Sequence, residues 1–354
     1  MVQGEMTSVS RSAFDTAQDE ASLPFQSTPF LTAWAQTRGA LSGRVQTVLT
    51  VPGADGRSHR IPLEIRRFGP LRIGSFPGET HANAAHPSGH PTGRLDLASA
   101  AKRVRLDALD LRRLPDTSWL PEAASVRPAL EDRFAITLDG GMEAVLANGN
   151  AKRKRKKFRA QQRHFEGLGG YVFRDVPPDA RSVVLDTFFA LKIARFAELG
   201  RPDPFQDPGT EAFLKRLFAD ADAGARLYIV ESGGTVKALM GGLASGRTFW
   251  GMFSAFADDE DADASPGELL LWHLVERLSA EGFATLDLGP GEERYKRSWC
   301  DLVVPQFDAV MAVTAGGRTY LAASRLRRSI VRRIKEKPKL LAVVQRVRRV
   351  LPRR

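Results

Sequence analysis

The chain has 354 residues, of which 43% are hydrophobic and 26% charged, a globular composition long enough for two domains. Its single cysteine, Cys300, excludes an intrachain disulfide, and the lack of an apolar run of about 18 residues argues against a membrane-spanning helix. The formal net charge of +11 is concentrated at one end, because residues 324–354 carry +12 and the remainder is close to neutral. A basic tail on a near-neutral body argues less for nucleic-acid binding than a basic body does.

The N-terminal segment, residues 1–24, is polar, and we expect it to be disordered. It contains Asp15, Asp19 and Glu20 and lacks the basic-then-apolar pattern of a signal peptide. Together with the single cysteine, this pattern favours a cytoplasmic location.

Residues 25–147 predict a first domain that contains both helices and strands. Helices are expected at residues 25–34 and 98–104, and strands at residues 44–51, 59–73, 105–114 and 126–138. Residues 74–93 between them are rich in Gly, Pro, Asn and His and predict a loop.

Three histidines in that loop, His81, His86 and His90, have a spacing that is seen at metal sites. The loop adds Glu79 as its one carboxylate, and it is rich in turn-forming residues. We therefore expect a solvent-exposed loop and no metal site.

Residues 148–320 predict a second domain, with the boundary near Asn148. It opens with a basic helix at residues 149–170, which has eight Lys or Arg between residues 152 and 163. The elements that follow are helices at residues 179–199 and 209–223, strands at residues 226–231, 236–243 and 248–253, and a closing strand pair within residues 303–313.

The stretch from residue 265 to residue 299 carries the strongest local signals. Ser265 is a predicted N-cap, Pro266 fits the first helical position, and Glu268 completes a capping box. The helix ends at Gly282, and residues 283–288 then predict a buried strand. A helix that leads directly into an apolar strand after earlier strands indicates an α/β crossover and a parallel strand pair.

Four motifs, together with the order of the predicted helices and strands, resemble the GNAT acyltransferase superfamily. They are the S-P-G at residues 265–267, the strand Leu286-Asp287-Leu288-Gly289, the Tyr295-Lys296-x-x-Trp299 motif, and the R-x-x-E-x-x-G pattern at residues 163–169. More narrowly, the chain is similar to the CelD-type acetyltransferases of polysaccharide biosynthesis, which are related to the FemABX aminoacyl transferases. The resemblance implies an α+β fold of tandem GNAT-like domains, a degenerate one at residues 25–147 and an acyltransferase domain at residues 148–320. Each would be a mixed, mostly antiparallel sheet flanked by helices, with a splayed parallel strand pair in the second.

The resemblance also implies a donor, acetyl-CoA or another acyl-CoA, in the gap between the splayed strands. The predicted donor-binding residues are Ser265, Pro266 and Gly267, because free N–H groups at a helix start favour a pyrophosphate, and Lys296, which would neutralise a phosphate or an acidic acceptor. Glu268 in the first turn would oppose that charge, and a well-capped helix alone explains the same motif equally well.

Two residues are predicted to carry the chemistry, Asp287 as general base and Tyr295 as general acid for the leaving thiolate. A base inside an apolar strand would have a raised pKa, but an exposed strand end and a turn covering the sheet edge explain the same residues. Glu198 and Glu231 are weaker alternatives for the base.

The predicted acceptor-binding residues are Arg159, Arg163 and Trp250. The resemblance suggests that the two arginines face an anionic acceptor, such as a nucleotide-sugar or a lipid-linked sugar phosphate. A solvated helix face explains the basic run as well, and nucleic acid is disfavoured because aromatic residues interleave poorly with the charges.

The tail, residues 321–354, predicts two basic amphipathic helices divided at Pro338. They fit an anionic membrane surface at the inner face of the membrane, although a solvated appendage fits equally well.

The sequence therefore predicts a GNAT-type acyltransferase that moves an acetyl or similar group from CoA to an amine or hydroxyl of a sugar or polysaccharide precursor, without a metal. A FemABX-like transferase that uses aminoacyl-tRNA is one alternative. A non-catalytic GNAT-like scaffold at the membrane surface is another.

Overall fold

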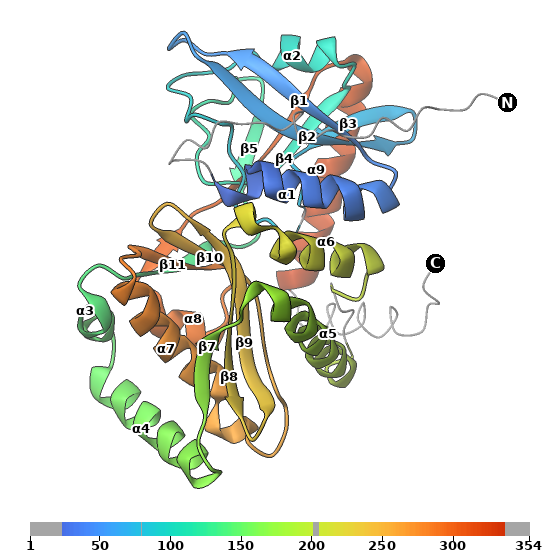
Figure 1. Cartoon of the computed structure of the whole chain (residues 1–354). Helices are drawn as coiled ribbons and strands as arrows, with labels where there is room; N and C mark the ends of the chain where they lie inside the picture. The colour runs from blue at the N-terminus through green and yellow to red at the C-terminus, as the bar shows by residue number, and fades with distance from the viewer. Residues whose placement is uncertain (1–22, 79, 201–204, 337–354) are drawn as a thin grey trace, which may run out of the picture.

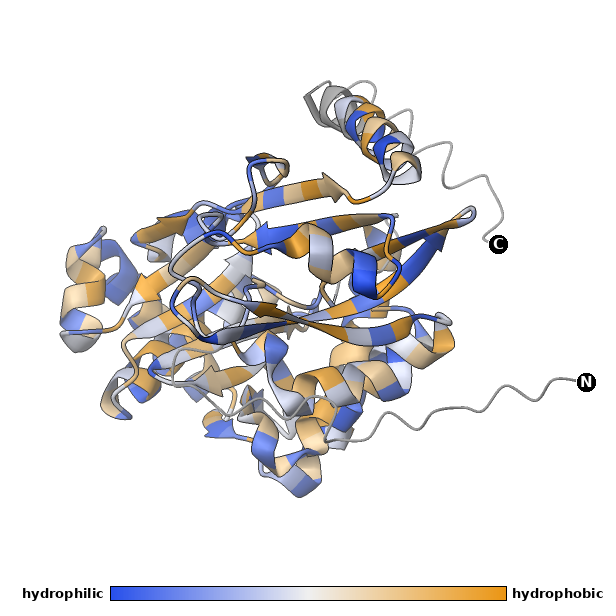
Figure 2. Cartoon of the chain, turned by 90° about the horizontal axis from the view of Figure 1, so that it is seen from above, coloured by the Kyte–Doolittle hydropathy of each residue, from blue (hydrophilic) through white to orange (hydrophobic). Residues whose placement is uncertain are grey.

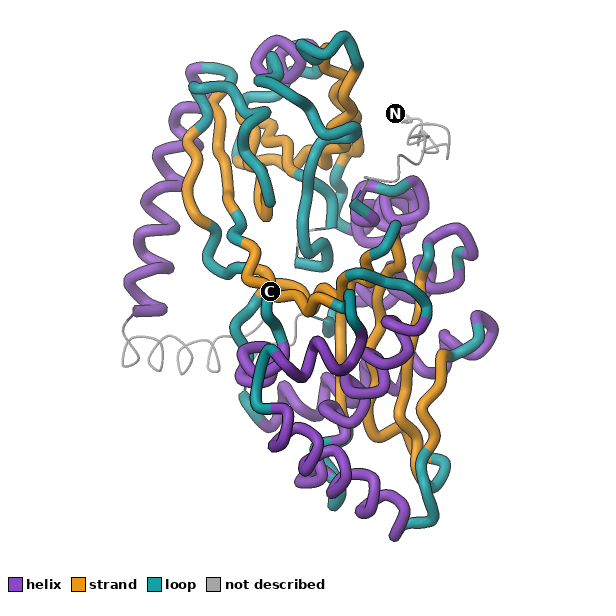
Figure 3. The backbone as a smooth tube through the Cα atoms, turned by 90° about the vertical axis from the view of Figure 1, so that its left-hand side faces the viewer, coloured by secondary structure: helices purple, strands orange, loops and turns teal. Residues whose placement is uncertain are grey.

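Two mixed sheets, each flanked by helices, organise the computed structural model, which describes residues 23–78, 80–200 and 205–336 (Figures 1 and 3). We call the part built on the six-stranded sheet the first unit and the part built on the seven-stranded sheet the second unit. Within the described ranges, no helix has both the length and the apolar composition needed to cross a bilayer.

The first unit has the strand order β1-β2-β3-β4-β13-β5. Its strands are β1 (Val45–Pro52), β2 (Ser58–Phe68), β3 (Leu71–Ser75), β4 (Ala108–Leu114), β5 (Ser125–Pro128) and β13 (Phe307–Ala312). Neighbours are antiparallel except β3 and β4, which are parallel and are connected through α2 (Leu97–Arg103). The parallel pairing covers Ile73↔Ala108 and Gly74↔Leu109, and β4 then continues away from β3.

The second unit has the strand order β12-β6-β11-β10-β9-β8-β7. Its strands are β6 (Arg133–Thr137), β7 (Val172–Asp175), β8 (Ala225–Ser232), β9 (Thr235–Ser245), β10 (Thr248–Phe256), β11 (Thr285–Pro290) and β12 (Leu302–Val304). Here β10 and β11 form the parallel pair, and all other neighbours are antiparallel. Each unit therefore places one parallel strand pair inside a mostly antiparallel sheet, whereas the sequence predicted such a pair only in the second domain.

Helices cover both faces of the second sheet. One face packs against α1 (Thr28–Trp34), α5 (Arg181–Glu198) and α6 (Pro208–Ala219), and the other against α3 (Gly141–Ala147), α4 (Ala151–Gly167), α7 (Pro266–Ala280) and α8 (Arg294–Trp299). Short turns of helix lie at Pro24–Gln26, Ala35–Gly39, Pro178–Ala180, Ala221–Ala223 and Ala262–Ala264. The last helix, α9 (Ala315–Glu336), packs on β4 and β13 of the first unit.

Helix α1 joins the two units although it stands at the start of the chain. Its Phe30 and Trp34 rings lie 5.2 and 5.1 Å from the ring of Phe213 in α6, both in edge-on geometry. The Trp34 indole also donates a 2.9 Å hydrogen bond to Glu64 of β2 in the first sheet. The two units thus share a continuous buried contact, with α1 lying between them in Figure 1.

Strand pairing crosses the predicted domain ranges at both ends. β6, which precedes Asn148, belongs to the second sheet, and β13, which precedes residue 320, returns to the first sheet between β4 and β5. The predicted single strand at residues 126–138 is therefore two strands in different sheets, and the predicted closing pair is not a hairpin, because β12 and β13 also lie in different sheets. Local patterns detect strands, but they do not encode which sheet a strand joins.

Most predicted helices and strands agree with the structure within a few residues, but two local predictions are wrong. Ser265 adopts a left-handed conformation (φ 57°) and makes no side-chain cap, so there is no capping box. Glu268 instead forms an ion pair with Lys157 of α4 at 2.9 Å. The loop at residues 74–93 is not solvent-exposed throughout, because His81 and His86 are 8% and 5% exposed.

Candidate active site

The parallel strands β10 and β11 separate after a short contact. They pair with each other from Thr248↔Thr285 to Trp250↔Asp287. Beyond this point β10 continues to Phe256 and β11 to Pro290, but the two strands no longer pair with each other. A bulge between Gly251 and Phe253 shifts β10 against β9 at the same point. The side of β10 that faces β11 therefore has no strand partner beyond Trp250, and a ligand could use its backbone groups, except for the Gly251 carbonyl, which Asn83 binds.

Two glycines on β9 allow this bulge. A Cβ on Gly241 would collide with the ring of Phe253, and a Cβ on Gly242 would collide with the carbonyl of Trp250. The Gly-Gly pair in an otherwise apolar strand thus makes room for the bulged residues of β10.

A cavity of about 240 Å³ occupies the gap between the two strands. Its walls come from residues 251–254 of β10, residues 288–290 of β11, Tyr295 and Lys296 of α8, and Asn83 from the loop of the first unit. The gap is therefore open as a cavity, and it is bounded on one side by the first unit.

Asn83 narrows this cavity at the point where the strands separate. Its side-chain amide donates to the carbonyl of Gly251 at 2.8 Å and lies 3.4 Å from the carboxylate of Asp287. The Gln306 amide, on the segment that returns to the first unit, donates to the Asn83 carbonyl at 2.6 Å. Asn83 thus bridges the two diverging strands from the neighbouring unit.

Asp287 precedes the lining residue Leu288, does not itself line the cavity, and is 2% exposed. Its carboxylate is 2.9 Å from Nε of Arg133 and accepts a 2.9 Å hydrogen bond from the N–H of Gly289. Burial raises the pKa of Asp287 to about 6, and the neighbouring Arg133 charge opposes that rise. Asp287 is thus not the exposed strand end considered above, and its carboxylate is held by partners from three elements.

Lys296 and Tyr295 line the cavity from α8. The Lys296 ammonium, only 3% exposed, donates to the carbonyls of Pro290 and Gly289 at 3.0 and 3.3 Å and pairs with Glu293 at 2.9 Å. Burial raises the pKa of the Tyr295 phenol, so the hydroxyl keeps its proton at neutral pH. Lys296 and Tyr295 therefore place a cation and a neutral proton donor side by side, and Arg113 and Lys192 also line the cavity.

The start of α7 lies next to the end of β10. A Cβ atom placed on Gly267 would lie 3.7 Å from the Phe256 ring. The amides of Glu268 and Leu269 are bonded to the carbonyl of Ser265, and Pro266 has no N–H, which leaves the Gly267 amide unpaired among the described residues. The carbonyl of Ser265 also accepts a 3.0 Å hydrogen bond from Gln161 of α4.

Acidic side chains before α7 are neutralised by nearby cations. Asp259 and Asp261 pair with Lys237 at 2.8 and 2.6 Å, and Asp261 also lies 2.8 Å from His164. With Glu268 held by Lys157, part of the negative charge that the sequence places beside the predicted donor site is compensated.

Comparison with known proteins decides the class of this fold. Residues 152–297 match the family described as an acetyltransferase (GNAT) domain. The chain contains a GNAT-type acetyltransferase domain. This match confirms the expected enzyme class, a GNAT-type acyltransferase, and the GNAT domain implies the use of acyl-CoA in general.

Three solved structures resemble both units together. FemX has a TM-score of 0.54 and 12% identity, covering 78% of this chain and 90% of FemX. A C-terminal domain from Agrobacterium fabrum, described as that of a lysylphosphatidylglycerol synthetase, has a TM-score of 0.53 and 11% identity and covers 86% of this chain and 92% of its own. A conserved protein of unknown function from Bacteroides thetaiotaomicron has a TM-score of 0.52 and 14% identity, covering 85% of this chain and 95% of that protein.

At these identities the likeness shows a shared fold, and with the GNAT domain match it confirms the expected tandem GNAT-like architecture. No curated protein matches the sequence.

The predicted acceptor residues lie outside the cavity of the GNAT domain. Arg159 and Arg163 are exposed on the outer face of α4. Trp250 is buried between the Phe25 ring, 5.6 Å away, and the guanidinium of Arg133, 4.8 Å from its ring centre. The structure thus assigns Trp250 to packing, and it brings together only Asp287, Tyr295 and Lys296 from the predicted set.

A second cavity, of about 360 Å³, lies in the first unit where β3 and β4 separate. It shares Thr80, Arg113, Glu131 and Pro290 with the cavity of the GNAT domain, so the two adjoin. Each unit therefore has a cavity beside its diverging parallel strands.

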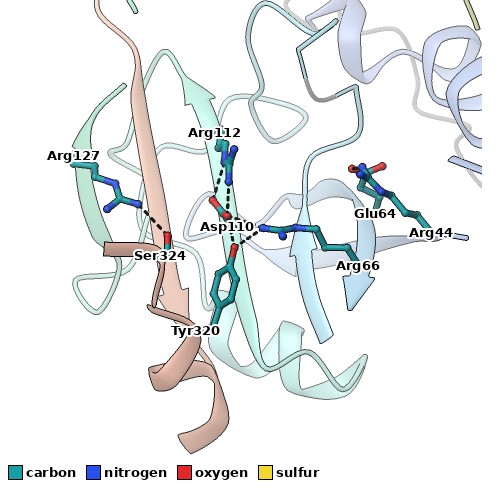
Figure 4. A network of polar contacts seen from close by, with 8 residues as sticks. All are labelled: Arg44, Glu64, Arg66, Asp110, Arg112, Arg127, Tyr320 and Ser324. Carbon is teal, nitrogen blue, oxygen red and sulfur yellow. Dashed lines mark hydrogen bonds and ion pairs between the residues drawn. The ribbon is translucent and has the colours of Figure 1, made fainter. Parts of the chain in front are cut away.

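Charged side chains line this second cavity (Figure 4). Asp110 is buried and binds both Arg112, at 2.9 Å, and Arg66, at 2.9 Å, while it also accepts a hydrogen bond from Tyr320 of α9. Burial opposes ionisation of Asp110, but the hydrogen bonds and charges of its partners lower its pKa to about 2. One carboxylate shared by two guanidiniums leaves an excess positive charge at this wall.

Sequence reasoning missed Asn83, Gln306 and the Arg66–Asp110–Arg112 group. Asn83 stood in a segment interpreted as an exposed loop, and the three charged residues stood in strands where they look like ordinary surface positions. The alternation of Asp110 and Arg112 in a strand that is otherwise apolar except for Arg113 was the local signal available.

Within the described residues, no group of three or more His, Cys, Asp or Glu side chains has a geometry that could hold a metal ion.

Proposed function

We propose that the GNAT domain transfers an acyl group, such as acetyl, from acyl-CoA to an amine or hydroxyl on an anionic acceptor, for example a sugar or polysaccharide precursor. The observation that carries this proposal is the cavity between β10 and β11, where pairing stops at Trp250↔Asp287. An extended thioester arm can use the unpaired backbone groups of β10 in the way that a further strand would.

The donor would run along β10 from the start of α7 to the bulge. The unpaired Gly267 amide and the dipole of α7 favour the pyrophosphate at one end. The thioester carbonyl would then lie beside Gly251 and Lys296 at the other end.

The chemistry requires one nucleophilic attack and two proton transfers. The acceptor amine or hydroxyl attacks the thioester carbon, the carbonyl oxygen becomes an oxyanion, and the C–S bond then breaks. The ammonium of Lys296 exchanges its ion pair with Glu293 for a contact with the oxyanion and stabilises it, and Tyr295 gives its proton to the departing thiolate. Asp287 is the predicted base, while Glu293 and Glu131 are the carboxylates that line the cavity itself.

The acceptor would extend from this cavity into the adjoining cavity of the first unit. Arg66 and Arg112 share one buried carboxylate, so a phosphate or carboxylate on the acceptor can complete their neutralisation. This position replaces the outer face of α4 as the proposed acceptor site, because Arg159 and Arg163 line neither cavity.

A second candidate, transfer from an aminoacyl-tRNA, is favoured by the outer face of α4. Lys152, Lys156, Arg159 and Arg163 repeat every three or four residues, so they form one exposed stripe about 16 Å long. Such a row of cations can follow a phosphate backbone.

The test is release of free CoA thiol from acetyl-CoA, measured with and without candidate acceptors. We expect acceptor-dependent release with phosphorylated or nucleotide-linked sugars and none with their uncharged counterparts. Transfer of an amino acid from charged tRNA, with no thiol released from acetyl-CoA, would support the second candidate instead.

A further inference from the structure

Helix α9 has two faces of different character. The inner face packs on the first sheet, where Gly317 and Tyr320 are buried and the Tyr320 hydroxyl bonds to Asp110. At 100° per residue, Ala323, Leu326 and Ile330 lie on the opposite face. Figure 2 shows α9 at the periphery of the molecule, with apolar and polar residues alternating along it.

The outer face exposes apolar side chains that no described part of the protein covers. Leu326 is 65% exposed and Ile330 is 49% exposed, and the alanines beside them are exposed as well. A soluble helix normally turns such residues inward.

Arginines flank this apolar ridge on both sides. Arg318 and Arg325 lie on one side and Arg327 on the other, and all three are exposed. Within the described residues, none of their guanidiniums is paired with a carboxylate, and Arg325 donates a 3.3 Å hydrogen bond to the Ser125 hydroxyl of β5. The helix as a whole has seven Lys or Arg and a single acidic residue, Glu336.

We propose that the outer face of α9 binds the surface of an anionic lipid bilayer, with the helix axis parallel to it. Leu326 and Ile330 would enter the boundary between head groups and acyl chains, and the flanking arginines would pair with lipid phosphates. Apolar burial and charge neutralisation then act on the same surface of one helix.

The charge pattern argues against two other occupants. Residues 337–354 have seven Lys or Arg and no acidic residue, so folding them back on α9 would bring like charges together. A nucleic acid would neutralise the arginines but leave the apolar ridge in water.

The site is connected to the first-unit cavity. Arg327 lines that cavity, and Ser324, one turn earlier, accepts a hydrogen bond from Arg127 of β5. A bilayer on α9 would therefore bring the cavity mouth near the lipid head groups. The surface proposal itself does not depend on the chemistry that we propose for the GNAT domain.

Cosedimentation of the full chain with lipid vesicles tests the proposal. We expect binding to vesicles that contain phosphatidylglycerol and little binding to vesicles of phosphatidylcholine alone. The Leu326→Asp/Ile330→Asp variant should bind the anionic vesicles at least about tenfold more weakly. Replacing Arg318, Arg325 and Arg327 by Gln should weaken binding and make it less sensitive to salt.

Val183→Asp is the matched control, because Val183 is an apolar residue on α5 that is 69% exposed. It should bind the anionic vesicles as the wild type does. Thermal unfolding of each variant shows whether the fold is kept, and Leu326→Ser/Ile330→Ser is a milder replacement if the aspartates unfold the helix.

Equal binding by the wild type and the Leu326/Ile330 variants, or no binding to anionic vesicles, would overturn the proposal. Equal binding of the wild type to both kinds of vesicle would also overturn it. So would a protein that binds no vesicles but binds RNA equally well as the wild type and as the Leu326→Asp/Ile330→Asp variant.

Discussion

The side-chain amide of Asn83 donates a 2.8 Å hydrogen bond to the carbonyl of Gly251, across the boundary between the two units. Gly251 is the first residue of β10 after its pairing with β11 ends. A residue of the first unit therefore occupies the point at which the cavity of the GNAT domain opens, and it couples the position of one unit to the shape of the other.

Replacing Asn83 with Leu should impair both folding and transfer. The change leaves the Gly251 carbonyl without this partner and removes one donor from Asp287, which we expect to cost about 1–3 kcal/mol of unfolding free energy. We also expect a lower kcat for thiol release. Asn148→Leu, at an exposed position, is the control; equal behaviour of the two variants in thermal unfolding and turnover would argue against a role for Asn83.

Two matched substitutions distinguish Asp287 from Glu293 as the general base. If Asp287 is the base, Asp287→Asn should lower kcat by about 10²- to 10⁴-fold, whereas Glu293→Gln should have a small effect. A large loss with Glu293→Gln and retained turnover in folded Asp287→Asn protein would transfer the role to Glu293.

Asp287 should also leave a signature in the pH dependence of stability. Its pKa is about 6 in the folded protein and 3.8 in the unfolded reference, so the folded state binds the proton more tightly. The free energy of unfolding should therefore fall by about 3 kcal/mol as pH rises through this interval. Denaturant unfolding of the wild type and Asp287→Asn between these pH values measures the difference, and parallel curves would contradict it.

Asp110 should show the opposite dependence. Its pKa is lowered to about 2, so it stabilises the fold above its unfolded value of 3.8 and loses that contribution as pH falls toward 2. Asp110→Asn leaves Arg66 and Arg112, which are both partly exposed, without their shared carboxylate and should destabilise the protein by about 2 kcal/mol at neutral pH. Chemical denaturation is the measurement, and an unchanged midpoint would show that the network contributes little.

Lys296 should affect turnover more than donor binding. Lys296→Met removes the ammonium beside the proposed oxyanion, and we expect kcat to fall by about 10²- to 10³-fold with little change in acetyl-CoA affinity. Lys296→Arg is the charge-conserving control and should retain part of the activity. A raised Kd for acetyl-CoA with unchanged kcat would instead assign Lys296 to donor binding.

The proposed acceptor site predicts a change in KM for the acceptor. Arg112→Gln should raise KM about tenfold for an anionic acceptor, since a charge-assisted hydrogen bond is lost, and should not change acetyl-CoA binding. Arg159→Gln, on the outer face of α4, serves as the matched control. If Arg159→Gln raises KM for the acceptor and Arg112→Gln does not, the acceptor site would instead be assigned to the outer face of α4.

Much of the fold could be predicted because local patterns encode it. The apolar run of β9, the hairpin at residues 232–234 and the crossover through α7 all follow from periodicity and turn residues, and they place Asp287, Tyr295 and Lys296 at one end of β11. Tyr295 and Lys296 of the predicted motif line this cavity, and their predicted roles stay predictions.

The features that the sequence could not predict depend on contacts between residues that are far apart in the chain. Asn83 and Gly251 are 168 positions apart, and no local pattern indicates that they meet. Trp250 looked available for a ligand because its burial depends on Phe25, far away in the chain. The capping box at Ser265 satisfied every local rule, but Lys157 of α4 binds Glu268 and the backbone of Ser265 adopts a left-handed turn.

Calorimetric titration of acetyl-CoA into the wild type and into Gly267→Trp tests the central claim most directly. The account predicts saturable heat with the wild type and at least about a tenfold weaker Kd with the variant, because an indole beside Phe256 would block the pyrophosphate from the start of α7. No heat from the wild type at millimolar acetyl-CoA, or equal affinity in a folded variant, would contradict it.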